Sequence, residues 1–489
     1  MEVGNGVEFF RNKIILITGA TGFLAKVLVE KILRVQPNVK KLYLLIRAKD
    51  NKAALERLHS EIIGKDLFRV LRERHGNLFD SFISEKVAPI TGDVSSINLG
   101  LTNNDSDFCK EVNAIVHSAA ITRFEERYDS ALGINTFGAR NIIGFAKTCP
   151  NLQILIDVST AYVCGKKTGL IPETLYNLDE NCCGIRGFDV NTEKKLVDNT
   201  LLDLTIKGAS SKEIRDTMKQ LGLKRAKLYG WPNTYVFTKA MGETLIHEHK
   251  GNLPLVIIRP TMISSTYKEP FPGWIEGLGS LANVSILNGK GYINLINGDG
   301  NTLFDSIPVD MVANSILTAM VANANKPCLE IYHVCSSLRN PLFLGKELDI
   351  HSKYFAKNPW YNGQGTLVKT NKFRLVKSRV QFQMLLVLLI VVSLMLKLVD
   401  IASCHFFKAY QDKLEMYIKV TYKVATNFRP YTCKYVIHRL FEDENTEKLR
   451  TTMSKHGMEE EGFNFDPKCI DWEDYLLNNH IPATVKYLF

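Results

Sequence analysis

Short apolar runs recur along the first half of the chain, separated by longer stretches of helical pattern. They occupy residues 14–17, 41–47, 87–90, 114–120, 152–160 and 255–260. Runs of this length, bounded by turn residues, are typical of strands that are buried on both faces of a parallel sheet. The pattern therefore predicts an α/β fold built on a doubly wound parallel sheet.

The first apolar run leads directly into a glycine turn and then into a helical pattern over residues 26–33. This order places the N–H groups of a helix N-terminus where they bind the pyrophosphate of a dinucleotide, as in a Rossmann-type sheet. Gly19 and Gly22 would allow the tight turn and the close approach of the phosphate. Alone, this glycine spacing also fits an ordinary strand–helix turn. The predicted cofactor-binding residues here are Thr18, Gly19, Thr21, Gly22, Phe23 and Leu24.

Tyr235 and Lys239 form the second informative motif, because their four-residue spacing places both side chains on one helix face. A free phenol has a pKa of about 10, and a nearby ammonium group lowers that pKa, which makes the phenol a better proton donor near neutral pH. Lys239 can also bind the nicotinamide ribose. Together with the upstream nucleotide site, the pair predicts hydride chemistry on a carbonyl group.

Thr160 ends the run 152–160, and we expect its hydroxyl to hydrogen-bond the substrate oxygen, with Ser159 as the alternative. Arg47 ends the second apolar run, where the adenosine ribose should lie. An arginine there favours the 2′-phosphate of NADP over the free hydroxyl of NAD. Asp50 is a mild objection, since a carboxylate would favour NAD. The remaining predicted cofactor contacts, besides Tyr235 and Lys239, are Asp93, Val94, Ala119, Ala120 and Pro260.

The connection between Thr160 and Tyr235 is much longer than a doubly wound dehydrogenase needs. We interpret residues 166–231 as an insertion, with helical composition at 191–223 interrupted by Gly208. Two interpretations stay open: a surface addition, or a lid or wall over the substrate.

The strand–helix alternation ends near residue 340. We predict a catalytic domain over 8–345, a linker over 346–383 and a mainly helical C-terminal domain over 384–489. Residues 384–396 are apolar on nearly every side but fall short of the ~20 residues of a membrane-spanning helix. A buried core helix, an interfacial helix and a true span are all considered. The short length and the adjacent Lys397 favour docking at a membrane surface.

Composition adds little to this picture. The net charge of +10 fits either a basic soluble surface or attraction to an anionic substrate or membrane face. No tract resembles a nucleic-acid-binding module, and the eleven histidines lack metal-ligand spacing. The ten cysteines contain no Cys-x-x-Cys pair, and no leader-like apolar run precedes the first strand. These features favour reduced thiols and a cytosol-facing catalytic domain.

Several stretches resemble the extended short-chain dehydrogenase/reductases and, more narrowly, the plant alcohol-forming fatty acyl-CoA reductases. They are residues 22–33, 158–163, 230–239, 269–274, 465–468 and 471–472. The resemblance covers nearly the whole chain. It implies a fatty acyl-CoA substrate, NADPH, a primary alcohol product and the cytosolic face of the endoplasmic reticulum membrane, in wax, cutin or suberin synthesis. His117 stands where the family usually has Asn, and Asp157 where it usually has His.

The resulting hypothesis is a four-electron reduction of the thioester through a bound aldehyde, using NADPH twice at one site. Two alternatives are kept. One is a sugar-nucleotide epimerase or dehydratase of the same fold, against which the long insertion and the apolar run argue. The other is a catalytically silent, membrane-docked NADP-binding protein, against which Tyr235, Lys239 and Thr160 argue.

Overall fold

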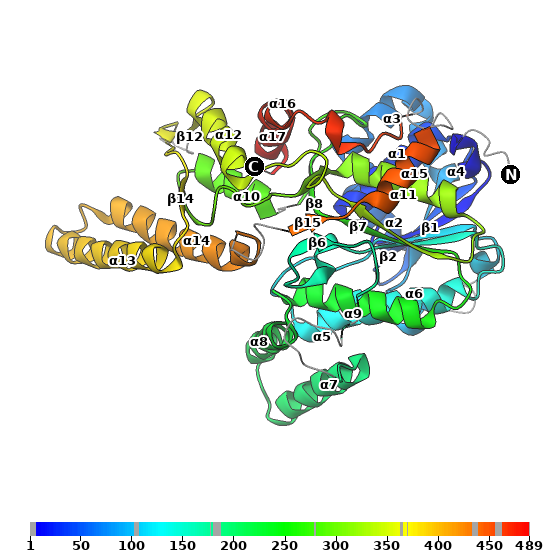
Figure 1. Cartoon of the computed structure of the whole chain (residues 1–489), viewed down its shortest axis with the longest axis horizontal. Coiled ribbons are helices and arrows are strands. Elements are labelled where there is room, and N and C mark those ends of the chain that lie inside the picture. Colours follow the sequence, from blue (N-terminus) through cyan, green and yellow to red (C-terminus); the bar gives the residue numbers. More distant parts are fainter. Residues whose placement is uncertain are drawn as a thin grey trace.

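A seven-stranded, all-parallel sheet forms the centre of the computed structural model (Figure 1). The structure describes residues 6–488 apart from 102–106, 177, 179–186, 278–279, 362–364, 369, 433–438 and 455–461. The strand order is β11-β7-β5-β4-β1-β2-β3. This order confirms the doubly wound fold, and its switch point places the ligand crevice at the carboxyl ends of β1 and β4.

The strands of this sheet are β1 (Ile14–Thr18), β2 (Lys41–Ile46), β3 (Val87–Thr91), β4 (Ala114–His117), β5 (Ile154–Val158), β7 (Leu255–Pro260) and β11 (Leu329–Val334). Short strands outside it are β6 (Gly169–Ile171), β8 (Met262–Ser264), β9 (Leu295–Asn297), β10 (Ser306–Pro308), β12 (Trp360–Tyr361), β13 (Leu367–Val368), β14 (Arg374–Val376) and β15 (Arg439–Phe441). The helices flanking the sheet are α1 (Phe23–Val35), α2 (Asn51–Arg57), α3 (Arg69–His75), α4 (Phe79–Lys86), α5 (Tyr128–Ala131), α6 (Gly138–Ala146), α9 (Thr234–His249) and α11 (Val309–Asn323). The others are α7 (Val190–Ile206), α8 (Ser211–Tyr229), α10 (Ser280–Gly289), α12 (Leu344–Lys357), α13 (Arg379–Ala402), α14 (Lys408–Thr432), α15 (Glu444–Ser454), α16 (Trp472–Asp474) and α17 (Ile481–Leu488).

Alternate residues of each central strand enter two separate cores, which is why these runs are apolar throughout. In β1, for example, Ile15 and Ile17 belong to the core that includes α1 and α11, whereas Ile14 and Leu16 belong to the core that includes α6. All six predicted strands are present. The sequence missed β11, which pairs in parallel with β7, because Glu330 and His333 interrupt its apolar pattern.

The insertion forms a helical hairpin of α7 and α8 that projects from the body of the protein (Figure 1). Gly208 lies between the two helices at a φ of 65°, a conformation that favours glycine. A buried ion pair between Glu193 and Arg225 ties the hairpin together, and the Tyr128 hydroxyl of α5 donates to Glu193 at 2.7 Å. The hairpin is therefore anchored to the catalytic body at its base.

The region after residue 340 differs from the expectation in two respects. The stretch 346–383 is not an extended linker, since it contains most of α12 and the strand β14. The apolar run lies within α13, whose 24 residues exceed the predicted 384–396 because polar residues extend both helix ends. A turn leads into α14, which packs against α13, and the pair projects from the body (Figure 1). The chain then returns, because β15 pairs with β6 and α15 contacts α11 and β11.

Candidate active site

The first two turns of α9 contain the tyrosine and the lysine that the sequence analysis singled out. Asn233 caps this helix by accepting the N–H of Val236 at 3.1 Å. Tyr235 follows in the first turn, and Lys239 lies one turn further along with 2% of its surface exposed. The Tyr235 hydroxyl forms a hydrogen bond with Thr160, which lies just beyond the end of β5. The structure thus brings a phenol, a hydroxyl and an ammonium group to the carboxyl edge of the sheet.

Thr160, rather than Ser159, is the partner of Tyr235. Successive residues of an extended chain point to opposite sides, so that only one of the two meets the phenol. Thr160 also accepts the N–H of Tyr162 at 3.4 Å and lies 3.5 Å from the carbonyl oxygen of Pro260. The Ser159 hydroxyl is buried and has no hydrogen-bond partner among the described residues.

The pKa of Tyr235 is shifted opposite to the expectation. Burial of the hydroxyl raises its pKa to about 12; the hydrogen bond with Thr160 lowers it by less, and Asp157 raises it further. The predicted lowering by Lys239 is wrong for this structure. The Lys239 ammonium group instead lies 3.8 Å from the Asp157 carboxylate.

The glycine turn fits the pyrophosphate of a dinucleotide. Gly19 has a φ of 70°, and a Cβ there would lie 2.7 Å from the backbone of Ala119, so that no side chain fits between β1 and the loop after β4. Gly22 is the N-cap of α1 and supplies no side-chain cap to the helix N–H groups. These amides are therefore available to an anion.

The other predicted cofactor residues divide by what their side chains contact. Leu24 is buried, and Phe23 is partly buried and packs on Trp274 with ring centroids 5.3 Å apart. Thr18 donates its hydroxyl to, or accepts from, His117 Nδ1 at 2.8 Å and accepts the N–H of Ala119 at 3.2 Å. Thr21 lies in the turn, and Ala119 and Ala120 are half-buried at the end of β4.

The residues assigned to the adenosine end lie after β2 and β3. Arg47 is exposed directly after β2. Asp50 accepts the N–H of Ala53 at 2.7 Å as the cap of α2, so that the objection it raised to NADP is weakened. Asp93 accepts the N–H and the hydroxyl of Ser95 at 2.8 and 2.7 Å, and Val94 is buried.

His117 and Asp157, the two residues that differ from the family's usual pattern, lie beside Thr18 and Lys239 of this site. They are paired neighbours on β4 and β5, and both are nearly fully buried. Burial, with a smaller effect of Lys239, lowers the pKa of His117 to about 3. Burial raises the pKa of Asp157 to about 6, against the attraction of Lys239. Polar residues inside otherwise apolar strands were the available sequence signal.

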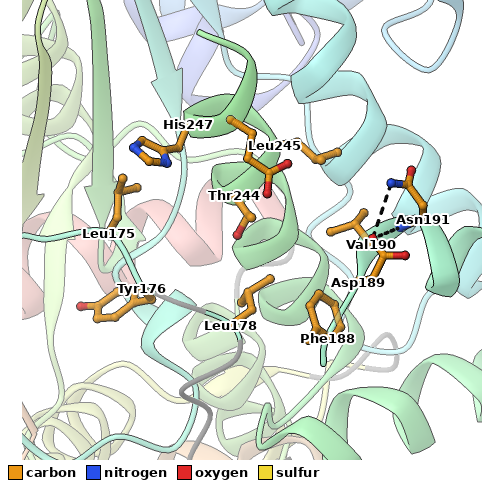
Figure 2. Close-up of a pocket in the computed structure, with 11 residues that line it drawn as sticks. Leu175, Tyr176, Leu178, Phe188, Asp189, Val190, Asn191, Thr244, Leu245 and His247 are labelled. Atoms are coloured by element: carbon orange, nitrogen blue, oxygen red, sulfur yellow. Dashed lines mark hydrogen bonds between the residues drawn. The ribbon is translucent and has the colours of Figure 1, made fainter. Parts of the chain in front are cut away.

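A cavity of about 390 Å³ lies at the opposite end of α9, against the start of α7 (Figure 2). Leu245 and His247 of α9 line it together with Phe188 and Val190. None of the predicted site residues does, so this cavity is separate from the site at Tyr235. Across the described residues, no group of three or more His, Cys, Asp or Glu side chains could hold a metal ion.

Comparisons with known proteins agree along the whole chain. A family described as "Male sterility protein" matches residues 17–316, and a second of the same description matches 390–489. The chain is 44% identical to the "Alcohol-forming fatty acyl-CoA reductase" of Simmondsia chinensis, over 100% of this chain and 99% of the relative. It is 47% identical to "Probable fatty acyl-CoA reductase 5" of Arabidopsis thaliana, over 99% of each.

Solved structures share the fold at low sequence identity. The terminal reductase domain of the myxalamid biosynthetic pathway superposes with a TM-score of 0.56 at 16% identity, covering 90% of this chain and 85% of that domain. A reductase domain of a nonribosomal peptide synthetase from Mycobacterium tuberculosis gives a TM-score of 0.53 at 18% identity, covering 91% of this chain and 86% of that domain.

Proposed function

This chain belongs to the fatty acyl-CoA reductase family, and from that premise we propose that it reduces a long or very-long-chain fatty acyl-CoA to the primary alcohol and CoA, with NADPH as reductant. The observation that carries the proposal is the meeting of Tyr235, Thr160 and Lys239 beside the uncapped glycine turn. This arrangement provides a proton donor next to a dinucleotide site, which reduction of a carbonyl requires.

Each residue of the site has its own role in the proposed reaction. When bound, NADPH supplies hydride to the carbonyl carbon. Thr160 holds the carbonyl oxygen by a hydrogen bond, and Tyr235 donates its proton to that oxygen. The resulting hemithioacetal releases CoA and leaves the aldehyde. The same two hydroxyl groups then act on the aldehyde, so that Tyr235 must be reprotonated between the two reductions.

The proposal is tested by product analysis. Purified protein, given NADPH and acyl-CoA of defined length, should consume two NADPH per primary alcohol formed. Yeast expressing the protein should accumulate primary alcohols. NADPH binding without turnover would support a silent binding protein instead, and turnover of sugar nucleotides without alcohol formation would support an epimerase or dehydratase.

Selection of NADPH over NADH is assigned to Arg47. Arg47→Asp should lower the ratio of the NADPH to the NADH specificity constant by about 10- to 100-fold, because a carboxylate repels the 2′-phosphate and accepts a ribose hydroxyl. Both specificity constants are measured with one acyl-CoA. Arg11→Asp is the matched control, since Arg11 precedes β1 and so lies toward the amino ends of the parallel strands, whereas Arg47 follows the carboxyl end of β2. An unchanged ratio in Arg47→Asp would show that Arg47 does not meet the cofactor.

We propose further that α13 docks the enzyme on the cytosolic face of the endoplasmic reticulum membrane. It is the one helix among the described residues that is long and apolar enough to cross a membrane. Its outward side is almost entirely apolar. The exposed residues include Met384, Val387, Leu388, Val391, Leu394, Met395 and Leu398.

Docking along the surface fits the hairpin better than a span. The second helix, α14, carries exposed lysines at 408, 413, 419 and 423, which a spanning hairpin would draw into the hydrocarbon. Lying in the interface, the hairpin can bury its apolar face and leave these lysines at the headgroups. The acyl chain of the substrate partitions into the same layer.

A further inference from the structure

Two polar side chains lie buried behind Lys239 without satisfying their hydrogen-bonding groups. The Asp157 carboxylate oxygens and His117 Nε2 have no hydrogen-bond partner among the described residues, and both side chains are about 1% exposed. His117 uses only Nδ1, toward Thr18. Unsatisfied buried polar groups are costly, so a site that keeps them is a candidate for a functional role.

Lys239 explains why a carboxylate is tolerated there. Its ammonium group lies 3.8 Å from Asp157 Oδ2, and only 2% of the Lys239 side chain is exposed. No other ion pair of Lys239 is found within the described part of the chain. In a dry site the attraction between an ammonium group and a carboxylate is strong, because little water screens the two charges.

The other ionisable groups around Asp157 cannot take over this role. His117, on the adjacent β4, stays neutral near neutral pH because burial lowers its pKa to about 3. Glu243, on α9, is committed to Arg259 of β7, with bonds of 3.0 and 2.6 Å. Tyr235 is a neutral phenol, because burial raises its pKa to about 12.

We propose that Asp157 is a positioning residue that acts through Lys239, as the buried counter-ion that holds the ammonium group in place for the nicotinamide ribose and the phenol. Ionised Asp157 thereby holds the cofactor-binding cation at neutral and alkaline pH. The inference rests on the proposed use of NADPH but not on the identity of the acyl substrate.

The proposal predicts that NADPH binding by Asp157→Asn differs from that by the wild type only above the pKa of Asp157. Burial raises the pKa of Asp157 to about 6, so that below this pH the carboxyl group is already neutral in the wild type. Asp157→Asn then changes little, because neither protein has the anion. Above this pH only the wild type has the anion, so that the Lys239 ammonium group of the variant lacks the attraction that holds it in place.

The test measures the NADPH dissociation constant by nicotinamide fluorescence, from about pH 5.5 to about pH 9. Asp157→Asn should match the wild type within about twofold at the acid end and bind NADPH at least about tenfold more weakly at about pH 8, because the variant lacks the anion that holds Lys239. Asp157→Ser, which also removes the charge and leaves space for a water molecule, should behave alike. Thermal melting establishes that each variant is folded.

Asp310→Asn is the matched control. Asp310 is likewise a buried carboxylate, but it accepts backbone N–H groups of residues 267–269, away from Lys239. Its binding curve should parallel that of the wild type at every pH. The proposal is overturned if the two Asp157 variants bind NADPH like the wild type at alkaline pH, if they are equally weakened at all pH values, or if neither folds. A protein that binds NADPH as predicted but makes no alcohol would contradict the proposed function and leave this inference standing.

Discussion

Tyr235→Phe is expected to lower alcohol formation by about 10²- to 10⁴-fold, the usual contribution of a positioned general acid. The substitution removes only the phenolic oxygen, which forms the hydrogen bond with Thr160. The ring and the packing around it remain, so that NADPH affinity should stay within about twofold of the wild type. The measurements are alcohol formed per enzyme by gas chromatography and NADPH binding by fluorescence titration.

A second buried tyrosine provides the control for Tyr235→Phe. The Tyr332 hydroxyl on β11 accepts from Asn323 at 3.1 Å, and β11 is the edge strand of the sheet, two strands from β5. Tyr332→Phe should lose about 1 kcal/mol of stability from that hydrogen bond and keep the wild-type rate. Near-wild-type turnover in Tyr235→Phe would remove Tyr235 from the role of proton donor.

Leu388→Glu combined with Met395→Glu is expected to move the protein from the microsomal pellet to the supernatant. These side chains are 57% and 61% exposed on the outward side of α13, so that neither substitution disturbs a core. A carboxylate in hydrocarbon costs roughly 2–3 kcal/mol, and two of them outweigh a modest interfacial affinity. Activity on acyl-CoA presented in detergent should survive, since the site at Tyr235 is untouched.

The matched control for the docking experiment is Leu202→Glu with Ile206→Glu. These residues are 58% and 74% exposed on α7, in the other projecting hairpin, and their substitution should leave the protein in the pellet. Docking through α13 would be refuted by a Leu388/Met395 variant that stays in the pellet. It would equally be refuted by carbonate-resistant insertion with a lumenal C-terminus, which would indicate a span.

The choice of these positions came from the structure. From the sequence alone, Leu389 and Val392 would have been the targets, because the run 384–396 is apolar on every side. Leu389, however, packs within the α13–α14 hairpin against the cluster that contains Phe382 and Leu386. Glu at Leu389 would disrupt the hairpin, and loss of membrane binding would then have no single cause.

The sequence determined the parts of this protein that depend on contacts between near neighbours along the chain. These parts are all local patterns. They are the strand runs buried on both faces, the turn at Gly19 and Gly22, the shared helix face of Tyr235 and Lys239, and the helical stretch interrupted at Gly208. Local steric and hydrophobic preferences make these patterns readable within short stretches of the sequence.

Only the tertiary structure decided how residues from distant strands meet. It added β11, which pairs with β7 although Glu330 and His333 interrupt its apolar pattern, and it turned Leu389 inward. It also buried the Tyr235 hydroxyl, which raises its pKa instead of lowering it, and it placed Asp157 of β5 beside Lys239 of α9. The physical reason is that burial and charge at a site depend on which segments pack there, and pairing of strands far apart in sequence is not encoded in the pattern of any one of them.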